Sequence, residues 1–366
     1  MAAERGHELQ LEGIGKRFGD SVAVCDIDLR IAAGELVALL GPSGCGKSTL
    51  LRIISGFMPQ SEGRVLFDGK SVDHLSASKR NVGIVFQNYA LFPHMTVRQN
   101  VAYGLEVQRY AKDRIGARVQ EMLALVQMTE FADRFPRQLS GGQQQRIALA
   151  RCLAVDPKIL LLDEPFGALD KNLRLDMQLE VKRLQREYGI TTVLVTHDQE
   201  EALSMADRVA VMSRGRIEQV STPVEIYDQP RTLFVNEFVG STNTFTAIVE
   251  SGDTQALSVR LQSGELLIVS AVQALAKGSA VTVSIRPEQM RLGSEASANA
   301  VAGVIAAALP LGPQVLYDIR RNIGPGFRVA VPRDGDTTIW AAGQAVYAAP
   351  RGAGEYRAFA ANTSST

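Results

Sequence analysis

The chain has 366 residues, of which 46% are hydrophobic and 21% are charged, the balance of a globular protein. This length exceeds one typical domain and suits two. Its 39 basic and 39 acidic side chains cancel, so the net charge gives no indication of a nucleic-acid partner.

The chain has three cysteines, Cys25, Cys45 and Cys152, an odd count without metal-ligand spacing. We expect free thiols in a reducing compartment. The first ten residues are polar and do not fit a signal peptide. The longest nearly uncharged apolar run, residues 300–309, falls short of the ~20 residues that cross a bilayer. Any membrane role is therefore expected to act through a partner.

The first two thirds of the chain alternate between buried-strand and helix patterns. Residues 35–40 form an apolar run that leads into a glycine-rich turn and a predicted helix over 48–54. Residues 158–163 and 191–196 are two more predicted strands, and the charged stretch 172–188 between them is predicted to be helical. Strand, helix and strand at this spacing favour an α/β fold with a largely parallel sheet.

Residues 88–151 lack strong strand patterns. Residues 114–126 and 146–153 carry apolar side chains at helical spacing. We therefore predict a mostly helical insertion within the α/β domain.

After residue 240 the pattern changes to short β-rich runs separated by Gly, Ser, Asp and Pro. These runs are residues 244–249, 256–261, 266–270, 280–285, 315–319 and 327–331. Such spacing is typical of a small antiparallel barrel. The predicted organisation is thus an α/β domain over 1–240 and an all-β barrel domain over 241–366.

A phosphate-binding motif follows the first predicted buried strand. It reads GPSGCGKST and fits the pattern G-x-x-x-x-G-K-[ST]. Its glycines let backbone N–H groups surround phosphates, Lys47 supplies charge to them, and the Ser48 hydroxyl can bind Mg²⁺. The alternative is a chance glycine-rich turn, which the strand before it and the helix after it disfavour. The candidate nucleotide contacts are Gly41, Pro42, Ser43, Gly44, Cys45, Gly46, Lys47, Ser48 and Thr49.

Two carboxylates end the predicted strand that begins at residue 158. Asp163 is placed to reach Mg²⁺, and Glu164 to orient the attacking water. An apolar strand that ends in Asp-Glu is often a mere strand-to-turn junction. The phosphate loop elsewhere in the same domain favours the catalytic interpretation.

Residues 139–143 read LSGGQ. In isolation they fit a serine N-cap followed by glycines at the start of a helix. Together with the two motifs above, they resemble the signature of the ATPase subunits of ABC transporters. The resemblance implies a P-loop ATPase that hydrolyses MgATP in a head-to-tail dimer. Ser140, Gly141, Gly142 and Gln143 would then close over the ATP of a second subunit.

The resemblance assigns roles to four further residues. Gln87 would sense Mg²⁺ and the γ-phosphate, and Asp170 would line the dimer seam. His197 would contact the γ-phosphate, and Phe18 would stack on adenine. The alternatives are a structural histidine and an ordinary core phenylalanine.

Three segments are typical of importer ATPases of the maltose and polyamine type: residues 88–94, 225–230 and 234–240. The C-terminal domain is similar to the small OB-like barrel of these importers, with residues 284–288 at its Arg-Pro-Glu segment. It would serve dimerisation or regulation, or be purely structural. The resemblance implies a homodimer at the cytoplasmic face of the inner membrane, two membrane-spanning permease subunits, an extracytoplasmic solute-binding protein and no nucleic acid.

The sequence does not identify the transported solute. A polyamine or an aminoalkyl-phosphonate is favoured, and sugar, iron(III) and sulfate are the alternatives. A soluble ABC ATPase of translation or DNA repair is a rival from another class, although those proteins usually carry two motif sets or a long coiled coil. An exporter motor and a generic P-loop enzyme such as a kinase fit the motifs less well.

Overall fold

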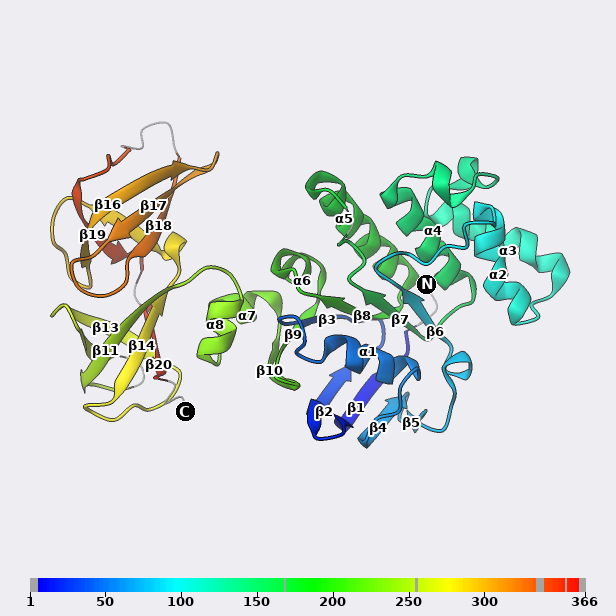
Figure 1. Ribbon diagram of the computed structural model, residues 1–366, viewed down its shortest axis with the longest axis horizontal. Helices are drawn as coiled ribbons and strands as arrows, with labels where there is room; N and C mark the ends of the chain where they lie inside the picture. The colour runs from blue at the N-terminus through cyan, green and yellow to red at the C-terminus, as the bar shows by residue number, and fades with distance from the viewer. Residues whose placement is uncertain (1–5, 168, 254–255, 334–338, 353, 362–366) are drawn as a thin grey trace. The chain divides into compact units, whose positions relative to one another are not determined.

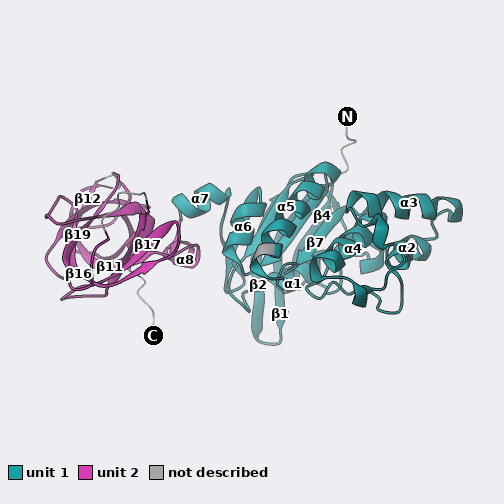
Figure 2. Cartoon of the chain, turned by 90° about the horizontal axis from the view of Figure 1, so that it is seen from above, with its two compact units in different colours: residues 1–230 teal, residues 231–366 magenta. Residues whose placement is uncertain are grey.

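The computed structural model describes residues 6–167, 169–253, 256–333, 339–352 and 354–361. The chain forms two compact units, Met1–Pro230 and Arg231–Thr366 (Figure 2). The division falls ten residues before the expected residue 240, because helix α8 (Leu233–Phe238) belongs to the second unit. Arg286 binds this helix: its Nη1 donates to the carbonyl oxygens of Asn236 at 3.1 Å and Ser241 at 3.2 Å.

A six-stranded sheet forms the centre of the first unit (Figure 1). In spatial order its strands are β10 (Arg216–Ser221), β9 (Arg208–Ser213), β3 (Leu36–Leu40), β8 (Thr191–Thr196), β7 (Ile159–Asp163) and β6 (Val82–Val85). All neighbours pair in parallel except β10 with β9. The predicted α/β class is confirmed. Because Leu40 pairs with Thr196 and Asp163 with Val195, β3, β7 and β8 end at the same edge of the sheet.

Strands from the first part of the chain form a four-stranded antiparallel sheet. Its order is β2 (Ser21–Ile31), β1 (Leu9–Phe18), β4 (Glu62–Phe67) and β5 (Lys70–Ser71). Helix α1 (Lys47–Ser55) contributes Leu50, Ile53 and Ile54 to a buried apolar core that both sheets share. This core fixes the helix that directly follows the phosphate loop.

Three helices make up the insertion that the sequence predicted. They are α2 (Val97–Val107), α3 (Lys112–Leu125) and α4 (Gly141–Ala154), and they pack on one another (Figure 1). Single turns of 3-10 helix occur at Ala77–Lys79, Thr129–Phe131 and Pro136–Gln138. The first unit also contains α5 (Lys171–Tyr188), α6 (Gln199–Met205) and α7 (Pro223–Asp228).

Arg118 of α3 ties the insertion to the rest of the first unit. Its guanidinium donates to the carbonyl oxygens of Leu153 and Ala154, both at 3.0 Å, and to the Tyr188 hydroxyl at 2.6 Å. It also pairs with Asp156 at 2.8 Å. These bonds satisfy carbonyls at the end of α4 that a helix leaves without intrahelical partners, so the helix that begins at residue 141 is anchored at its far end.

Apart from α8 and one turn of 3-10 helix at Pro287–Gln289, the described part of the second unit is built of β-strands, as the sequence predicted. Its closed barrel consists of β11 (Asn243–Ser251), β12 (Leu257–Leu261), β13 (Leu266–Ala271), β20 (Arg357–Ala360) and β14 (Ala280–Ile285). A second sheet consists of β15 (Met290–Gly293), β19 (Ala345–Pro350), β16 (Val301–Pro310), β17 (Gln314–Arg320) and β18 (Phe327–Pro332). Both enclose one apolar core, and one barrel pair, β13 with β20, is parallel rather than antiparallel. Across the described ranges, no helix has both the length and the apolar character to span a membrane.

Candidate active site

The phosphate loop, residues 41–46, connects β3 to α1, and its backbone needs glycine at two positions. Gly46 has a φ of 109°, and a Cβ there would lie 2.7 Å from the Ala23 carbonyl oxygen. A Cβ on Gly41 would lie 2.4 Å from the Met212 carbonyl oxygen. Both distances are far below van der Waals contact, so a side chain at either position would displace the loop.

Lys47 places a buried charge at this loop. The residue is 6% exposed, and its Nζ donates to the carbonyl oxygens of Gly41 at 2.6 Å and Pro42 at 3.0 Å. Within the described part of the chain, no carboxylate forms an ion pair with Lys47. Gly46 caps α1 without a side-chain hydrogen bond, which leaves the helix N-terminus available to an anion. A buried cation beside a helix N-terminus fits a phosphate group.

Asp163 lies at the end of β7 on the same sheet edge. Burial raises the pKa of Asp163, and the negative charge of Glu164 raises it further, whereas Arg52 and Lys47 act in the opposite direction. A partly desolvated carboxylate oxygen is a ligand that Mg²⁺ prefers, together with a hydroxyl and phosphate oxygens. Over the residues that the structure describes, no cluster of three His, Cys, Asp or Glu side chains could hold a metal on its own.

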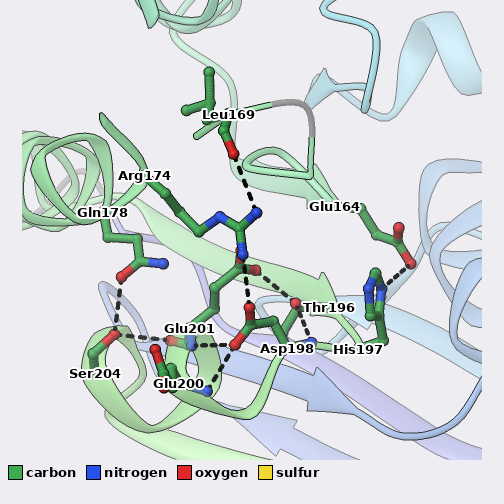
Figure 3. Close-up of polar contacts among 10 residues, drawn as sticks. All are labelled: Glu164, Leu169, Arg174, Gln178, Thr196, His197, Asp198, Glu200, Glu201 and Ser204. Atoms are coloured by element: carbon green, nitrogen blue, oxygen red, sulfur yellow. Dashed lines mark hydrogen bonds and ion pairs between the residues drawn. The ribbon is translucent and has the colours of Figure 1, made fainter. Parts of the chain in front are cut away.

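Glu164 and His197 meet where β7 and β8 end. The Glu164 Oε1 and the His197 Nδ1 are 3.1 Å apart (Figure 3). Glu164 adopts a left-handed φ of 46°, and its N–H donates to the Val195 carbonyl oxygen at 2.9 Å. A non-glycine residue in this conformation costs free energy, and such residues cluster at functional sites. The side chains are 27% and 59% exposed, so water reaches both.

Gln87 follows β6 and approaches the turn after Glu164. A Cβ on Gly167 would lie 3.3 Å from the Gln87 Nε2. The next segment, residues 88–94, contains two more left-handed residues, Tyr89 with a φ of 60° and Ala90 with a φ of 47°.

Arg151 of α4 holds these two residues. Its Nη1 donates to the Ala90 carbonyl oxygen at 2.7 Å and its Nη2 to that of Tyr89 at 2.9 Å. Its guanidinium also lies over the Phe92 ring, 5.6 Å from the centroid. The sequence prediction missed Arg151, since its partners lie about sixty positions earlier and no local pattern joins them.

The LSGGQ segment opens α4. Ser140 is the N-cap: its Oγ accepts from the Gln143 N–H at 3.4 Å, and the Gln143 Oε1 accepts from the Ser140 N–H at 3.0 Å. The N-cap interpretation therefore describes the local structure. Gly142 lies against α5, since a Cβ there would be 3.1 Å from Leu173 Cδ1. Within the described ranges, no hydrogen bond joins residues 140–143 to the phosphate loop.

Two predicted contacts lie at the ends of elements. Phe18 ends β1 and is 51% exposed, with the Lys16 Nζ 5.3 Å from its ring centroid. Phe18 is therefore not a core residue. Asp170 is the N-cap of α5, and its Oδ1 accepts from the Leu173 N–H at 3.1 Å.

A parallel sheet whose strand ends carry a phosphate loop and a carboxylate pair defines the class as a P-loop nucleotide-binding protein. The comparisons agree: residues 24–167 match the ABC transporter family, and residues 283–353 match the TOBE domain.

The chain is similar to curated relatives along most of its length. It is 49% identical over 89% of the chain and 86% of the relative to the spermidine/putrescine import ATP-binding protein PotA of Nitratidesulfovibrio vulgaris. It is 44% identical over 89% of the chain and 91% of the relative to the sulfate/thiosulfate import ATP-binding protein CysA of Thermosynechococcus vestitus.

Two solved structures are similar to about three fifths of the chain. A dimeric post-hydrolysis state of the ATP-binding cassette MJ0796, bound to ADP and Pi, aligns with a TM-score of 0.52 and 34% identity, covering 59% of the chain and 98% of that structure. CbiO1 of Clostridium perfringens, part of the ABC transporter complex CbiONQ, aligns with a TM-score of 0.56 and 33% identity, covering 60% and 90%. The chain belongs to the ABC transporter family, as an ATP-binding subunit with ATPase activity. The predicted family is confirmed.

Proposed function

We propose that this chain powers the import of a polyamine, hydrolysing MgATP in a head-to-tail dimer beneath two membrane-spanning permease subunits. It would act at the cytoplasmic face of the inner membrane, with an extracytoplasmic solute-binding protein delivering the solute. The observation that carries the solute assignment is the 49% identity over 89% of the chain to a spermidine/putrescine import ATP-binding protein. The competing solute is sulfate, supported by the relative at 44% identity.

The site residues have separate roles in ATP hydrolysis. Lys47 and the N-terminal amides of α1 hold the β- and γ-phosphates. The hydroxyl of Ser48, the carboxylate of Asp163 and the amide oxygen of Gln87 would hold Mg²⁺, which neutralises charge on the phosphates when bound.

Glu164 and His197 act on the reacting groups. The Glu164 carboxylate orients a water molecule and accepts its proton, while the imidazole of His197 contacts the γ-phosphate. The water oxygen bonds to the γ-phosphorus, the bond to the β-phosphate oxygen breaks, and ADP and inorganic phosphate leave. The 3.1 Å contact between Glu164 Oε1 and His197 Nδ1 supports this division, because it puts a base and a donor side by side.

The proposed dimer assigns residues 140–143 of each chain to the nucleotide of its partner. Residues 140–143 open α4 and are not hydrogen-bonded to the phosphate loop within the described residues of one chain. In a head-to-tail pair, the N-terminus of α4 from the partner faces the γ-phosphate, where its amides and helix dipole favour an anion. The dimeric state of the MJ0796 cassette supports this arrangement.

The role of Glu164 is tested by Glu164→Gln. The amide keeps the size of the side chain and leaves the phosphate loop intact, so we expect ATP affinity within about threefold of wild type. Hydrolysis should fall by about 10²–10⁴-fold, the usual contribution of a positioned general base. Steady-state ATPase rates and nucleotide titration measure both quantities, and undiminished turnover would remove Glu164 from the assigned role.

The solute is tested in cells that lack this gene. Uptake of radiolabelled spermidine, putrescine and sulfate is measured after complementation with the wild-type gene, with the Glu164→Gln gene, and with an empty vector. The proposal expects that only wild type restores spermidine or putrescine uptake and that sulfate uptake is the same in all three. Restoration of sulfate uptake instead would establish the sulfate alternative and overturn the polyamine assignment.

A further inference from the structure

One side chain of α5 links the loop that carries His197 to the segment that leads into α5. The Arg174 Nη1 donates to the Asp198 Oδ2 at 3.0 Å, and its Nη2 donates to the Leu169 carbonyl oxygen at 3.2 Å (Figure 3). Asp198 directly follows His197, and Leu169 directly precedes Asp170. A single guanidinium therefore fixes the distance between these two segments.

The backbone on both sides of His197 is fixed by polar contacts. The Thr196 Oγ1 accepts from the Asp198 N–H at 2.9 Å and donates to the Glu201 Oε2 at 2.6 Å. The Asp198 Oδ1 accepts from the Glu200 N–H at 2.8 Å and so caps α6 (Figure 3). The two oxygens of Asp198 thus act separately, since one caps the helix and the other receives Arg174.

A hollow adjoins the His197 loop on its α5 side. Its volume is about 620 Å³, and its walls include Arg174, Leu175, His197 and Asp198. Leu175, beside Arg174 on α5, is 55% exposed. Arg174 contacts Asp198 beside this hollow, so its contacts constrain the loop from that direction.

Arg174 is also incompletely satisfied. Its Nε is buried and has no hydrogen-bond partner among the residues that the structure describes. A buried donor without a partner costs stability. If Arg174 served stability alone, a side chain without an unpaired buried N–H would be expected at this position. A role in bridging two segments explains why this cost in stability is retained.

We propose that Arg174 is a positioning residue that holds the His197 loop at working distance from Glu164. The proposal rests on the role of His197 given above. A planar guanidinium suits this role, because its two terminal nitrogens reach a carboxylate and a carbonyl oxygen at once. Lysine has one ammonium group and would keep one of the two contacts.

The experiment measures kcat and KM for ATP in the full chain carrying Arg174→Met, Arg174→Lys, Asp198→Asn or both Arg174→Met and Asp198→Asn. The matched control is Arg183→Met on the same helix, which removes pairs with Glu180 at 3.0 Å and Glu187 at 2.5 Å. Asp198→Asn keeps an oxygen for the α6 cap and loses the charge that faces Arg174.

We expect Arg174→Met to lower kcat about tenfold and leave KM within about twofold, because Lys47 and α1 hold the phosphates independently. Arg174→Lys should recover part of the loss. Asp198→Asn should reduce kcat about as much as Arg174→Met, and the double variant should be no worse than either, since both changes break one contact. Arg183→Met should match wild type.

Three results would overturn the proposal: a kcat for Arg174→Met equal to that of the Arg183→Met control, a rise in KM without a fall in kcat, or losses that multiply in the double variant. If Arg174→Met does not fold, Arg174→Lys and Asp198→Asn decide by the same criteria. His197→Ala in the same assay separates the two claims. Full activity there would refute the role of His197, whereas a loss there with unchanged Arg174 variants would refute only the role of Arg174.

Discussion

The stacking role of Phe18 leads to a prediction whose magnitude follows from its exposure. Phe18 ends β1 and is 51% exposed. The Lys16 Nζ lies 5.3 Å from its ring centroid. A purine that stacks on this ring would cover surface that water now contacts.

The expected energy follows from the exposed area. A phenylalanine side chain presents roughly 200 Å², so about half of it, ~100 Å², is available to a base. At ~25 cal/mol per Å² this area contributes at most about 2.5 kcal/mol. Base–aromatic stacking contributes about 1–3 kcal/mol on truncation to alanine. A loss of about 1 to 2.5 kcal/mol means that Phe18→Ala should weaken ATP binding about 5- to 70-fold.

Calorimetric titration measures this change in a Glu164→Gln background, in which hydrolysis is suppressed. Inorganic tripolyphosphate, which has no base, should bind the Phe18→Ala variant as tightly as the parent. Phe18→Trp should retain ATP affinity, and Phe57→Ala, which truncates another phenylalanine that is 60% exposed, is the matched control. An ATP dissociation constant within twofold of the parent, or an equal loss of tripolyphosphate affinity, would refute the stacking role.

Three other changes test the structure around the site. Gly46→Ala puts a Cβ 2.7 Å from a backbone oxygen at a φ of 109°, so ATP affinity in nucleotide titration should fall at least about tenfold. Arg118→Met removes the donor to Tyr188 and to the end of α4, which should cost roughly 3 kcal/mol and lower the calorimetric melting temperature of the first unit by about 6–12 °C. Burial raises the pKa of Cys152 to about 11, so its thiol stays protonated and should not react with iodoacetamide at pH 8 until the protein unfolds.

Each of the three has an outcome that contradicts it. Unchanged ATP affinity in Gly46→Ala would mean that the loop accommodates a side chain. The side chain of Arg183 is 45% exposed. A melting temperature for Arg118→Met no lower than that of Arg183→Met would mean that the buried contacts contribute no more than surface ones. Rapid labelling of folded protein at Cys152 would contradict its burial.

Local patterns in the sequence were sufficient to predict where several candidate site residues lie in the fold. The phosphate loop and His197 each follow a buried strand, Asp163 ends one, and the ends of parallel strands meet at one edge of a sheet. Gly142 was also predicted, although its close approach to α5 is visible only in the structure.

The positioning side chains were not predictable in this way. Arg151 contacts residues about sixty positions earlier, and Arg174 contacts Asp198, 24 positions later in the chain. The left-handed conformations of Tyr89 and Ala90 are equally invisible in the sequence, because neither residue is one that turns favour.

The second unit was predicted as a barrel, but four of its strands were missed. Three of them, β16, β19 and β20, are rich in alanine, which has a low strand propensity. The apolar run at residues 300–309 was weighed as a membrane segment and is strand β16. Closure of the barrel depends on the pairing of β20 with β13, some 87 positions apart, which no local pattern specifies.

The central claim, that this ATPase drives membrane transport, is tested most directly by what the full chain binds in its own cells. The tagged protein is isolated in mild detergent and its partners are identified by mass spectrometry, with an untagged strain as the control. The account predicts the recovery of membrane proteins with many spanning segments, together with a solute-binding protein. Recovery of ribosomal or DNA-repair proteins without any membrane partner would leave the ATPase chemistry standing and contradict the transport function.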